Sequence, residues 1–377
     1  MRKLDQLTGW RFIAAFGVIL CHFSDLLIGN HSPVVRRMFE GMANFVGFFF
    51  ILSGFILAYN YQARFLSGST TVREFLGARF ARIYPACIFS LAVALPCFLF
   101  VNIRSHIPFA QIGGHALATL LMIKTWLPFV DWSKIADWNG PMWSIETEFF
   151  FYLCFPFLIR PLAKLNLKQN YVAWIVLVIV MIGCSAVYDS FLSRNGIELY
   201  KGAFDFFHGS PYFCILEFAI GIITFNISTQ LTSEQLDGIK RCMRWVILIL
   251  VVAYGVTNAN MAQMGVLHGV PAILFSIVIL GSFTEPPVLK ILATPTFVFL
   301  GEVSYSLYLL HIPVRRLFEY ASKVINPMAA LQEKAPPIFA LVIVSSSLLL
   351  ASFCYYNVEA PWRRRLRRFF AGAGKKE

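Results

Sequence analysis

Charged residues are scarce in this chain. Asp, Glu, Lys and Arg together make up 14% of its 377 residues, whereas hydrophobic residues make up 58%, and the mean hydropathy is +0.67. Soluble domains usually carry about 25% charged residues, because a water-exposed surface needs them. The composition therefore excludes a soluble domain, a disordered chain, a coiled coil and a collagen-like protein.

The sequence also lacks the short motifs of several common functional sites. It contains no CxxC pair, no HxxxH or HExxH pattern, no Gly-rich phosphate loop and no GxSxG elbow. Most of its eight cysteines lie inside apolar stretches, where they are expected to act as small core residues. We therefore expect no metal site and no disulfide framework.

The net charge is +12, from 32 Lys and Arg against 20 Asp and Glu. In a soluble protein this excess would suggest nucleic acid as a partner. In a membrane protein, basic residues accumulate on the cytoplasmic side, so we expect no nucleic-acid partner.

Arg2 and Lys3 precede an apolar run as in a secretory signal, but Arg11 interrupts it and no cleavage site follows Ser24, which favours an uncleaved first span.

Long apolar stretches predict an all-α polytopic membrane protein. At roughly 20 residues per crossing, the apolar material suffices for about ten transmembrane helices. These expected spans lie near residues 10–29, 42–61, 84–103, 148–164, 172–191, 212–227, 245–259, 268–284, 296–316 and 337–358.

A further apolar stretch, near residues 115–130, is short and ends at Pro128. The basic clusters between the spans all fall on one side of the membrane only if this stretch does not cross it. We therefore expect a re-entrant or interfacial helix here, and both termini in the cytoplasm. Residues 1–361 are expected to form one membrane domain, and residues 362–377 a basic cytoplasmic tail.

Arg11 and His22 are ionisable residues in the first span, where burial is costly and function is a reasonable hypothesis. Eleven residues at ~1.5 Å rise place them about 16 Å apart on nearly the same helical face. Histidine is the usual general acid or base near neutral pH, and arginine binds phosphate or carboxylate. A topology anchor at Arg11 and a helix–helix hydrogen bond at His22 are the alternatives.

Arg79 and Arg82 lie three residues apart at the start of the third span, so they share a helical face. Two guanidinium groups on one face suit bidentate phosphate binding. Anchoring of the topology is again the alternative.

Ser144 and Glu148 lie one helical turn apart at the start of the fourth span. A lone carboxylate is expensive inside a span, so Glu148 is expected to face a polar interior and a partner such as His or Arg. Acidic residues in the first turn of a helix are favourable, which explains Glu146 but explains Glu148 less well. Glu146 has no defined role.

Tyr305, Tyr308 and His311 follow each other at three-residue spacing, so one face carries three polar tips. Interfacial aromatic residues and a histidine at a helix end would produce the same pattern.

In the second span, Ser53 and Gly54 form a small pair that is interpreted as a site of close helix packing.

Taken in this order, these groups resemble the acyltransferase-3 family of integral membrane acyltransferases, which includes bacterial O-acetylases of surface polysaccharides. The family's pattern of Arg, ten residues and His fits Arg11 and His22, and its SxxxE pattern fits Ser144 and Glu148. The other matching blocks are residues 49–55 (FFxxSGF), Arg79 with Arg82 (RxxR), and residues 304–311 (SYxxYLxH).

The resemblance implies transfer of an acyl group, usually acetyl from cytoplasmic acetyl-CoA, to a hydroxyl of a cell-surface or exported carbohydrate. It also implies a multi-pass protein of the bacterial inner membrane, in contact with membrane lipid, with acetyl-CoA as donor substrate and no bound cofactor. Some relatives carry an extracytoplasmic esterase-like domain, whereas a chain that ends in a basic tail is similar to the stand-alone members. The oligomeric state is not indicated.

The same resemblance suggests roles for the candidate residues. The phosphates of CoA are expected to contact Arg11, Arg79 and Arg82. His22 is expected to act as the base for the acceptor hydroxyl or as the nucleophile, oriented by Glu148 as an acid orients the histidine of a catalytic triad. The acceptor side or the oxyanion environment is expected to be lined by Ser144, Tyr305, Tyr308 and His311.

A secondary transporter or exporter of a saccharide or lipid-linked molecule is the alternative function. It would use the intramembrane His and Glu as a proton relay. Such transporters usually contain internal repeats with discontinuous helices, and no repeat is visible in this sequence. A non-catalytic sensor would leave the paired polar residues within the spans unexplained.

Overall fold

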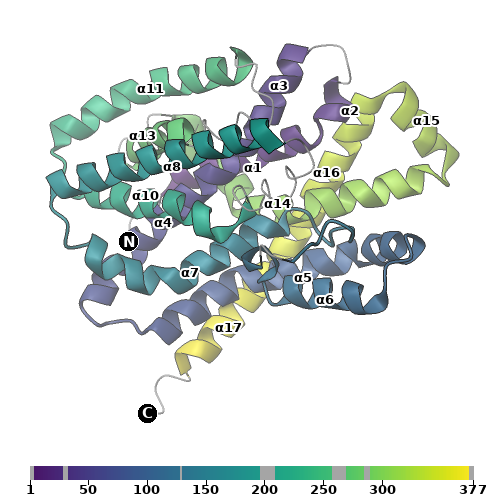
Figure 1. Ribbon diagram of the computed structural model, residues 1–377, viewed down its shortest axis with the longest axis horizontal. Coiled ribbons are helices and arrows are strands. Elements are labelled where there is room, and N and C mark those ends of the chain that lie inside the picture. Colours follow the sequence, from purple (N-terminus) through teal and green to yellow (C-terminus); the bar gives the residue numbers. More distant parts are fainter. Residues whose placement is uncertain are drawn as a thin grey trace.

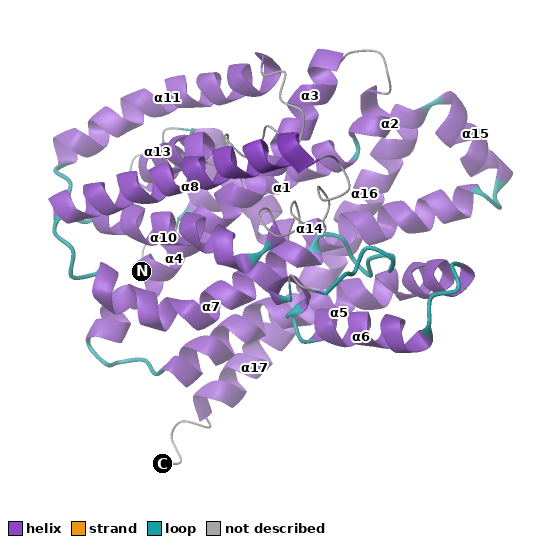
Figure 2. Ribbon diagram, in the orientation of Figure 1, coloured by secondary structure: helices purple, strands orange, loops and turns teal. Residues whose placement is uncertain are grey.

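The computed structural model describes residues 4–28, 33–127, 130–195, 209–256, 269–283 and 289–372. Every regular element in these ranges is a helix (Figure 2). Ten of the described helices have 15 or more residues: α1 (Asp5–His22), α4 (Phe45–Leu66), α5 (Val72–Arg104), α7 (Met142–Leu162), α8 (Leu167–Asn195), α10 (Pro211–Ser228), α11 (Ser233–Val256), α13 (Gly269–Phe283), α14 (Pro295–Ser322) and α16 (Pro336–Cys354).

The expectation of an all-α, multi-pass membrane protein is confirmed. Seven of the described helical stretches are long and apolar enough to cross a membrane: Met38–Leu66, Val72–Arg104, Met142–Leu162, Leu167–Cys184, Pro211–Ser228, Pro295–Ser322 and Pro336–Phe370. The other three expected spans also correspond to helices. These are α1, the shorter apolar helix α13, and α11, beyond which residues 257–259 lie outside the described ranges.

The stretch expected to be re-entrant or interfacial contains a helix too short to cross. Helix α6 (Phe109–Leu120) has 12 residues, or about 18 Å at ~1.5 Å per residue, against a hydrocarbon core of roughly 30 Å. A single 3₁₀ turn, η2 (Lys124–Trp126), follows it. Pro128 lies outside the described residues. Figure 1 shows α6 beside α5, at the right-hand side of the bundle.

The ends of the chain lie on one side of the bundle. In Figure 1, the beginning of α1 and the end of the C-terminal helix α17 (Ala360–Gly372) are both at the left. The turns 67–71, 163–166 and 229–232 are also there. We call this side the basic end, because Arg64, Arg73, Arg160, Lys164 and Lys168 lie in or next to these turns. The opposite side carries α6 and two short helices, α2 (Ser24–Ile28) and α15 (Asn326–Lys334).

Helices α4 and α10 approach each other closely through two glycines. A Cβ atom added at Gly54 would lie 2.0 Å from the carbonyl oxygen of Phe218, and one added at Gly221 would lie 2.0 Å from that of Ile51. Glycine permits such backbone contact because it has no side chain. The interpretation of this region as a packing site is therefore confirmed for Gly54.

Replacing Gly54 with alanine should destabilise the protein by about 1–3 kcal/mol, the usual cost of overpacking a buried contact. The measurement is thermal unfolding of the purified protein in detergent. Gly113→Ala is the matched control, because a Cβ atom there would meet no other atom within 4 Å. Equal melting temperatures for the two variants would contradict the close approach of α4 and α10.

Helix α5 begins about three turns before the predicted span at residue 84. A capping box at its start explains this, since Thr71 accepts a hydrogen bond from the backbone of Glu74 and the Glu74 side chain accepts one from the backbone of Thr71. Pro85 lies inside the helix, as is common in membrane spans. Arg79 and Arg82 are therefore inside α5 rather than before it.

The last span continues into the basic segment without a break. Helix α16 passes through a π-helical turn, η6 (Tyr355–Glu359), into α17. Phe370 of α17 packs on α5, where it would lie 2.5 Å from a Cβ atom at Gly77. The expected tail is thus helical up to Gly372 and packed against the bundle, while residues 373–377 lie outside the described ranges.

Candidate active site

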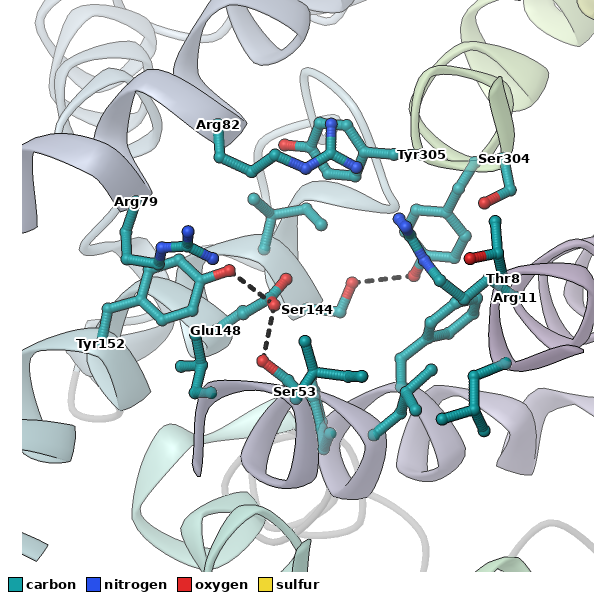
Figure 3. A pocket seen from close by; sticks show the side chains of 18 of the residues that line it. Thr8, Arg11, Ser53, Arg79, Arg82, Ser144, Glu148, Tyr152, Ser304 and Tyr305 are labelled. Carbon is teal, nitrogen blue, oxygen red and sulfur yellow. Dashed lines mark hydrogen bonds between the residues drawn. The ribbon is translucent and has the colours of Figure 1, made fainter. Parts of the chain in front are cut away.

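A cavity of about 370 Å³ lies between helices α1, α4, α5, α7 and α14. Figure 3 shows polar side chains that point into it from several of these helices. Seven of the nine predicted site residues line it: Arg11, Arg79, Arg82, Ser144, Glu148, Tyr305 and Tyr308. The structure therefore brings together residues that are up to 297 positions apart in the sequence.

Two of the three arginines in the cavity have hydrogen-bond donors to spare. Arg79 donates one bond to the hydroxyl of Tyr61 (3.0 Å), but its Nε atom is buried without a partner. Arg11 has no hydrogen-bond or ion-pair partner among the described residues. Unpaired cations are costly inside a membrane protein, and guanidinium groups bind phosphate or carboxylate bidentately. This part of the cavity can therefore receive an anion.

Arg82 has a partner that was not predicted from the sequence. Its Nη1 atom donates to the fully buried carboxylate of Glu359, and the second oxygen of Glu359 accepts a bond from Ser306 Oγ (2.8 Å). Glu359 ends the π-helical turn η6, and such turns often occur at functional sites. An acid directly after the last apolar span, next to a run of arginines, was the signal in the sequence.

Glu148 is held by two hydroxyl groups of the cavity wall (Figure 3). Its Oε1 atom accepts a bond from Ser53 Oγ (2.9 Å) and another from the hydroxyl of Tyr152 (2.7 Å). Ser53 thus has a role beyond the packing that its small size suggested. Tyr152 lies one turn after Glu148 in α7, a spacing that the sequence contains but that we did not single out.

The predicted pairing of Glu148 with His22 is wrong. Glu148 bonds the two hydroxyls just described, whereas His22 Nδ1 lies 2.8 Å from Nε2 of His311. The physical reason is helix packing, because α1 packs along α14 and so meets the histidine of that helix. The spacing of residues within single helices does not reveal which helices are neighbours.

Ser144 and Tyr308 meet across the cavity, with 2.8 Å between their oxygens. The hydroxyl of Ser144 also bonds the carbonyl oxygen of Pro141 (3.0 Å), which can only accept. Since serine has one hydroxyl proton, Tyr308 donates and Ser144 accepts in their shared bond. This bond links α7 to α14.

Tyr305 belongs to the arginine end of the cavity rather than beside Tyr308. Its hydroxyl donates to the carbonyl oxygen of Ile83 (3.0 Å), and Arg82 lies over its ring at 5.3 Å from the centroid. The ring face attracts the guanidinium. Tyr305 therefore helps to position Arg82.

His22 and His311 form a pair next to the cavity. Neither lines the cavity itself, but Tyr308 does, and its ring centroid lies 5.9 Å from that of His311. His311 is fully buried, and His22 is partly buried. The pair lies beyond Arg11 along the first helix, because His22 is the last residue of α1 and follows Arg11 by eleven residues, or about 16 Å at ~1.5 Å per residue.

An ion-pair cluster lies just beyond the histidines. Arg315 bonds both carboxylate oxygens of Asp25 (3.1 and 2.6 Å) and also Glu319 (2.7 Å), and it donates to the carbonyl oxygen of His22. This cluster was not predicted from the sequence. It ties the end of α1 and the start of α2 to α14.

Glu146, whose role the sequence left undefined, holds the segment after α6 against α7. Its carboxylate accepts a bond from the backbone of Thr125 (3.0 Å) and is fully buried. The same segment is held by Asp137, which contacts Lys124 (2.5 Å) and His115 (3.1 Å). Burial alone would raise the pKa of Asp137, but Lys124 and His115 hold it well below its usual range.

The arrangement has two chemically different parts, joined by hydroxyl groups. One part presents guanidinium donors to an anion, and the other presents a paired imidazole that can move a proton or attack a carbonyl. Among the described residues, no group of three or more His, Cys, Asp or Glu side chains could hold a metal ion.

Comparison with known proteins identifies the family of the chain. The acyltransferase-3 family, described as an acyltransferase domain, matches residues 4–356. The chain is 29% identical to acyltransferase MdmB of Streptomyces mycarofaciens, over 83% of this chain and 79% of that protein. It is 24% identical to O-acetyltransferase OatA of Staphylococcus aureus, over all of this chain but only 60% of OatA. No solved structure is significantly similar.

The family match covers nearly the whole chain and includes every residue that lines the cavity. It ends three residues before Glu359, so the partner of Arg82 lies just outside it. The described helices enclose a cavity lined partly by polar side chains, and seven helical stretches are long and apolar enough to cross a membrane. The chain is therefore a multi-pass membrane enzyme that belongs to the acyltransferase-3 family.

Proposed function

We propose that the protein transfers an acetyl group from acetyl-CoA to a hydroxyl group of a cell-surface or exported carbohydrate. The observation that carries the donor assignment is the presence of Arg11 and Arg79, with unused donors, in a cavity inside the bundle. The phosphates of CoA supply several negative charges that would compensate these cations. Arg82, oriented by Glu359 and Tyr305, completes the phosphate-binding group.

The donor enters from the basic end in this proposal. Arg11 lies in the first half of α1, and Arg79 and Arg82 lie in the first third of α5, both of which start at that end. The pantetheine arm then follows the cavity toward Tyr308 and His22. Basic loops face the cytoplasm in membrane proteins, so this end, with both termini, is assigned to the cytoplasmic face of the bacterial inner membrane.

The reaction needs one proton transfer at the acceptor. His22 removes the proton from the acceptor hydroxyl while the oxygen of that hydroxyl attacks the thioester carbonyl. The carbon–sulfur bond breaks, an ester forms, and the thiolate of CoA takes the proton from His22 and leaves as a thiol. In a two-step route the same imidazole first carries the acetyl group and then passes it to the hydroxyl.

The acceptor assignment is supported by the hydroxyl chemistry in the names of relatives such as O-acetyltransferase OatA and by the polar wall near Ser144 and Tyr308. Hydroxyl groups of the protein there can exchange hydrogen bonds with those of a sugar. A membrane-embedded enzyme with its histidine pair remote from the basic end is suited to an acceptor on the outer face.

The test uses the full chain reconstituted in lipid nanodiscs with labelled acetyl-CoA and a mixture of cell-envelope glycans. We expect release of CoA thiol that depends on the glycan, and label in an alkali-sensitive ester on the carbohydrate. The proposal would be contradicted if no glycan fraction acquired a labelled ester and the label stayed on the protein or was released into water.

A further inference from the structure

We propose that His311 is a positioning residue that holds His22 in the tautomer with its proton on Nδ1, so that Nε2 of His22 carries the reactive lone pair. The inference rests on the proposed function for the use of that lone pair, but the tautomer itself is independent of any substrate. It follows from two hydrogen-bond contacts, one between α1 and α14 and one within α14.

The carbonyl oxygen of Tyr308 determines the first proton. It lies 2.6 Å from Nδ1 of His311, and a carbonyl oxygen can only accept. Nδ1 of His311 therefore carries a hydrogen. A neutral imidazole has one N–H donor and one acceptor nitrogen, so Nε2 of His311 is the acceptor in the neutral pair.

The second proton follows from the contact between the rings. Nε2 of His311 lies 2.8 Å from Nδ1 of His22, so His22 must donate through Nδ1. The ring centroids are 5.0 Å apart with an interplanar angle of 11°. Rings this nearly parallel, with nitrogens much closer than centroids, meet edge to edge, which aligns the N–H of one with the lone pair of the other.

Nε2 of His22 is then the unprotonated nitrogen. It has no hydrogen-bond partner among the described residues, and His22 is only partly buried. The carbonyl oxygen of His22 is fixed by Arg315, which also restrains the end of α1. The backbone and the ring are therefore both held, and the free nitrogen is available to a hydroxyl or a thioester.

In this arrangement a neutral imidazole, that of His311, does what the acid does in a catalytic triad. In those triads an aspartate holds the histidine in the correct tautomer. Here the carboxylate of Glu148, expected from the sequence to do this, is bonded to Ser53 and Tyr152 instead. His311 supplies the acceptor, and the backbone of Tyr308 determines its orientation.

Nitrogen-15 NMR of the full chain, labelled at histidine and held in nanodiscs, tests the tautomer directly. The His22 signals are assigned by their loss in His22→Gln. We expect a protonated Nδ1 and an unprotonated Nε2 for His22 in the wild type, and loss of this preference in His311→Leu. A wild-type His22 protonated on Nε2 would overturn the proposal, whether or not acyl transfer is ever detected.

Kinetics provide the second test. His311→Leu removes the acceptor, whereas the side-chain oxygen of His311→Gln can still accept the bond from His22. We expect the leucine variant to lose at least about 10²-fold in kcat with an unchanged KM for acetyl-CoA, because a wrong tautomer costs about 10⁴-fold in a catalytic triad. We expect the glutamine variant to retain most of kcat.

His106→Gln is the control, since His106 is exposed on the segment after α5. It should change neither the kinetics nor the His22 signals. Equal losses in the leucine and glutamine variants, with the His22 tautomer unchanged in both, would show that His311 acts only in packing and would overturn the inference.

Discussion

Replacing His22 with alanine should reduce acyl transfer by about 10²–10⁴-fold, the range that general acid–base catalysis contributes. The variant keeps the arginines and the cavity, because His22 does not line the cavity. Both ring nitrogens of His311 have hydrogen-bond partners, whereas Nε2 of His22 has none among the described residues. The substitution therefore removes the one imidazole of the pair that has a free nitrogen. The loss should therefore appear in kcat, with little change in the KM for acetyl-CoA.

The measurement is the initial rate of CoA release by the purified variant, at saturating acetyl-CoA and glycan. Cys21→Ala is a suitable control, because Cys21 is a free, buried thiol next to His22 on α1 and does not line the cavity. It should behave like the wild type. A fully active His22→Ala protein would remove His22 from the mechanism and would leave the histidine pair with a structural role.

The second large effect is expected at the arginine end. Replacing Arg11 and Arg79 together with glutamine should raise the KM for acetyl-CoA by roughly ten- to hundredfold for each arginine, since a hydrogen bond to a charged group contributes about 1.5–3 kcal/mol. Arg82 is left in place because it is bonded to the buried Glu359. Removing one partner of a buried ion pair would also destabilise the protein.

This prediction is checked by steady-state kinetics over a range of acetyl-CoA concentrations and by direct binding of CoA. Arg73→Gln is the matched control, because Arg73 lies in the first turn of the same helix but is exposed and outside the cavity. If Arg73→Gln weakened donor binding as much as the double variant, the basic end would attract CoA only by its overall charge.

Much of the fold follows from the sequence because burial in a membrane imposes long apolar helices. The expected spans correspond to helices, including α1 and α5, which carry Arg11 and Arg79. The helix limits are less predictable. The third span was expected to start near residue 84, but the capping box at Thr71 begins the helix earlier, and Pro85 inside the helix does not end it.

Seven of the nine predicted site residues line one cavity, but the contacts between them were not predictable. Helical periodicity places Ser144 and Glu148 on one face, and both do line the cavity. It does not indicate that Tyr308 reaches Ser144, or that His311 rather than Glu148 reaches His22. Such pairs depend on which helices are neighbours, and the sequence of a single chain does not contain that information.

The contact between Glu359 and Arg82 was also not predictable from the sequence. The side chain of Glu359 bonds Arg82, 277 positions away in the sequence. Glu359 lies in a π-helical turn, which the periodicity of the sequence does not predict. In the sequence it follows the last apolar span and precedes a basic run, where an acid is easily assigned to a solvated segment. Only the packing of α16 and α17 against α5 and α14 brings it into the site.

The central claim is that the donor's phosphates bind at Arg11 and Arg79 while its acyl group reaches His22. The most direct test is a structure of the full chain bound to an unreactive thioether analogue of acetyl-CoA. We predict the diphosphate in hydrogen-bond contact with Arg11 and Arg79, and the ketone that replaces the thioester carbonyl beside Nε2 of His22. An analogue bound without contact to Arg11 and Arg79, or bound with its acyl end toward the basic end, would contradict the account.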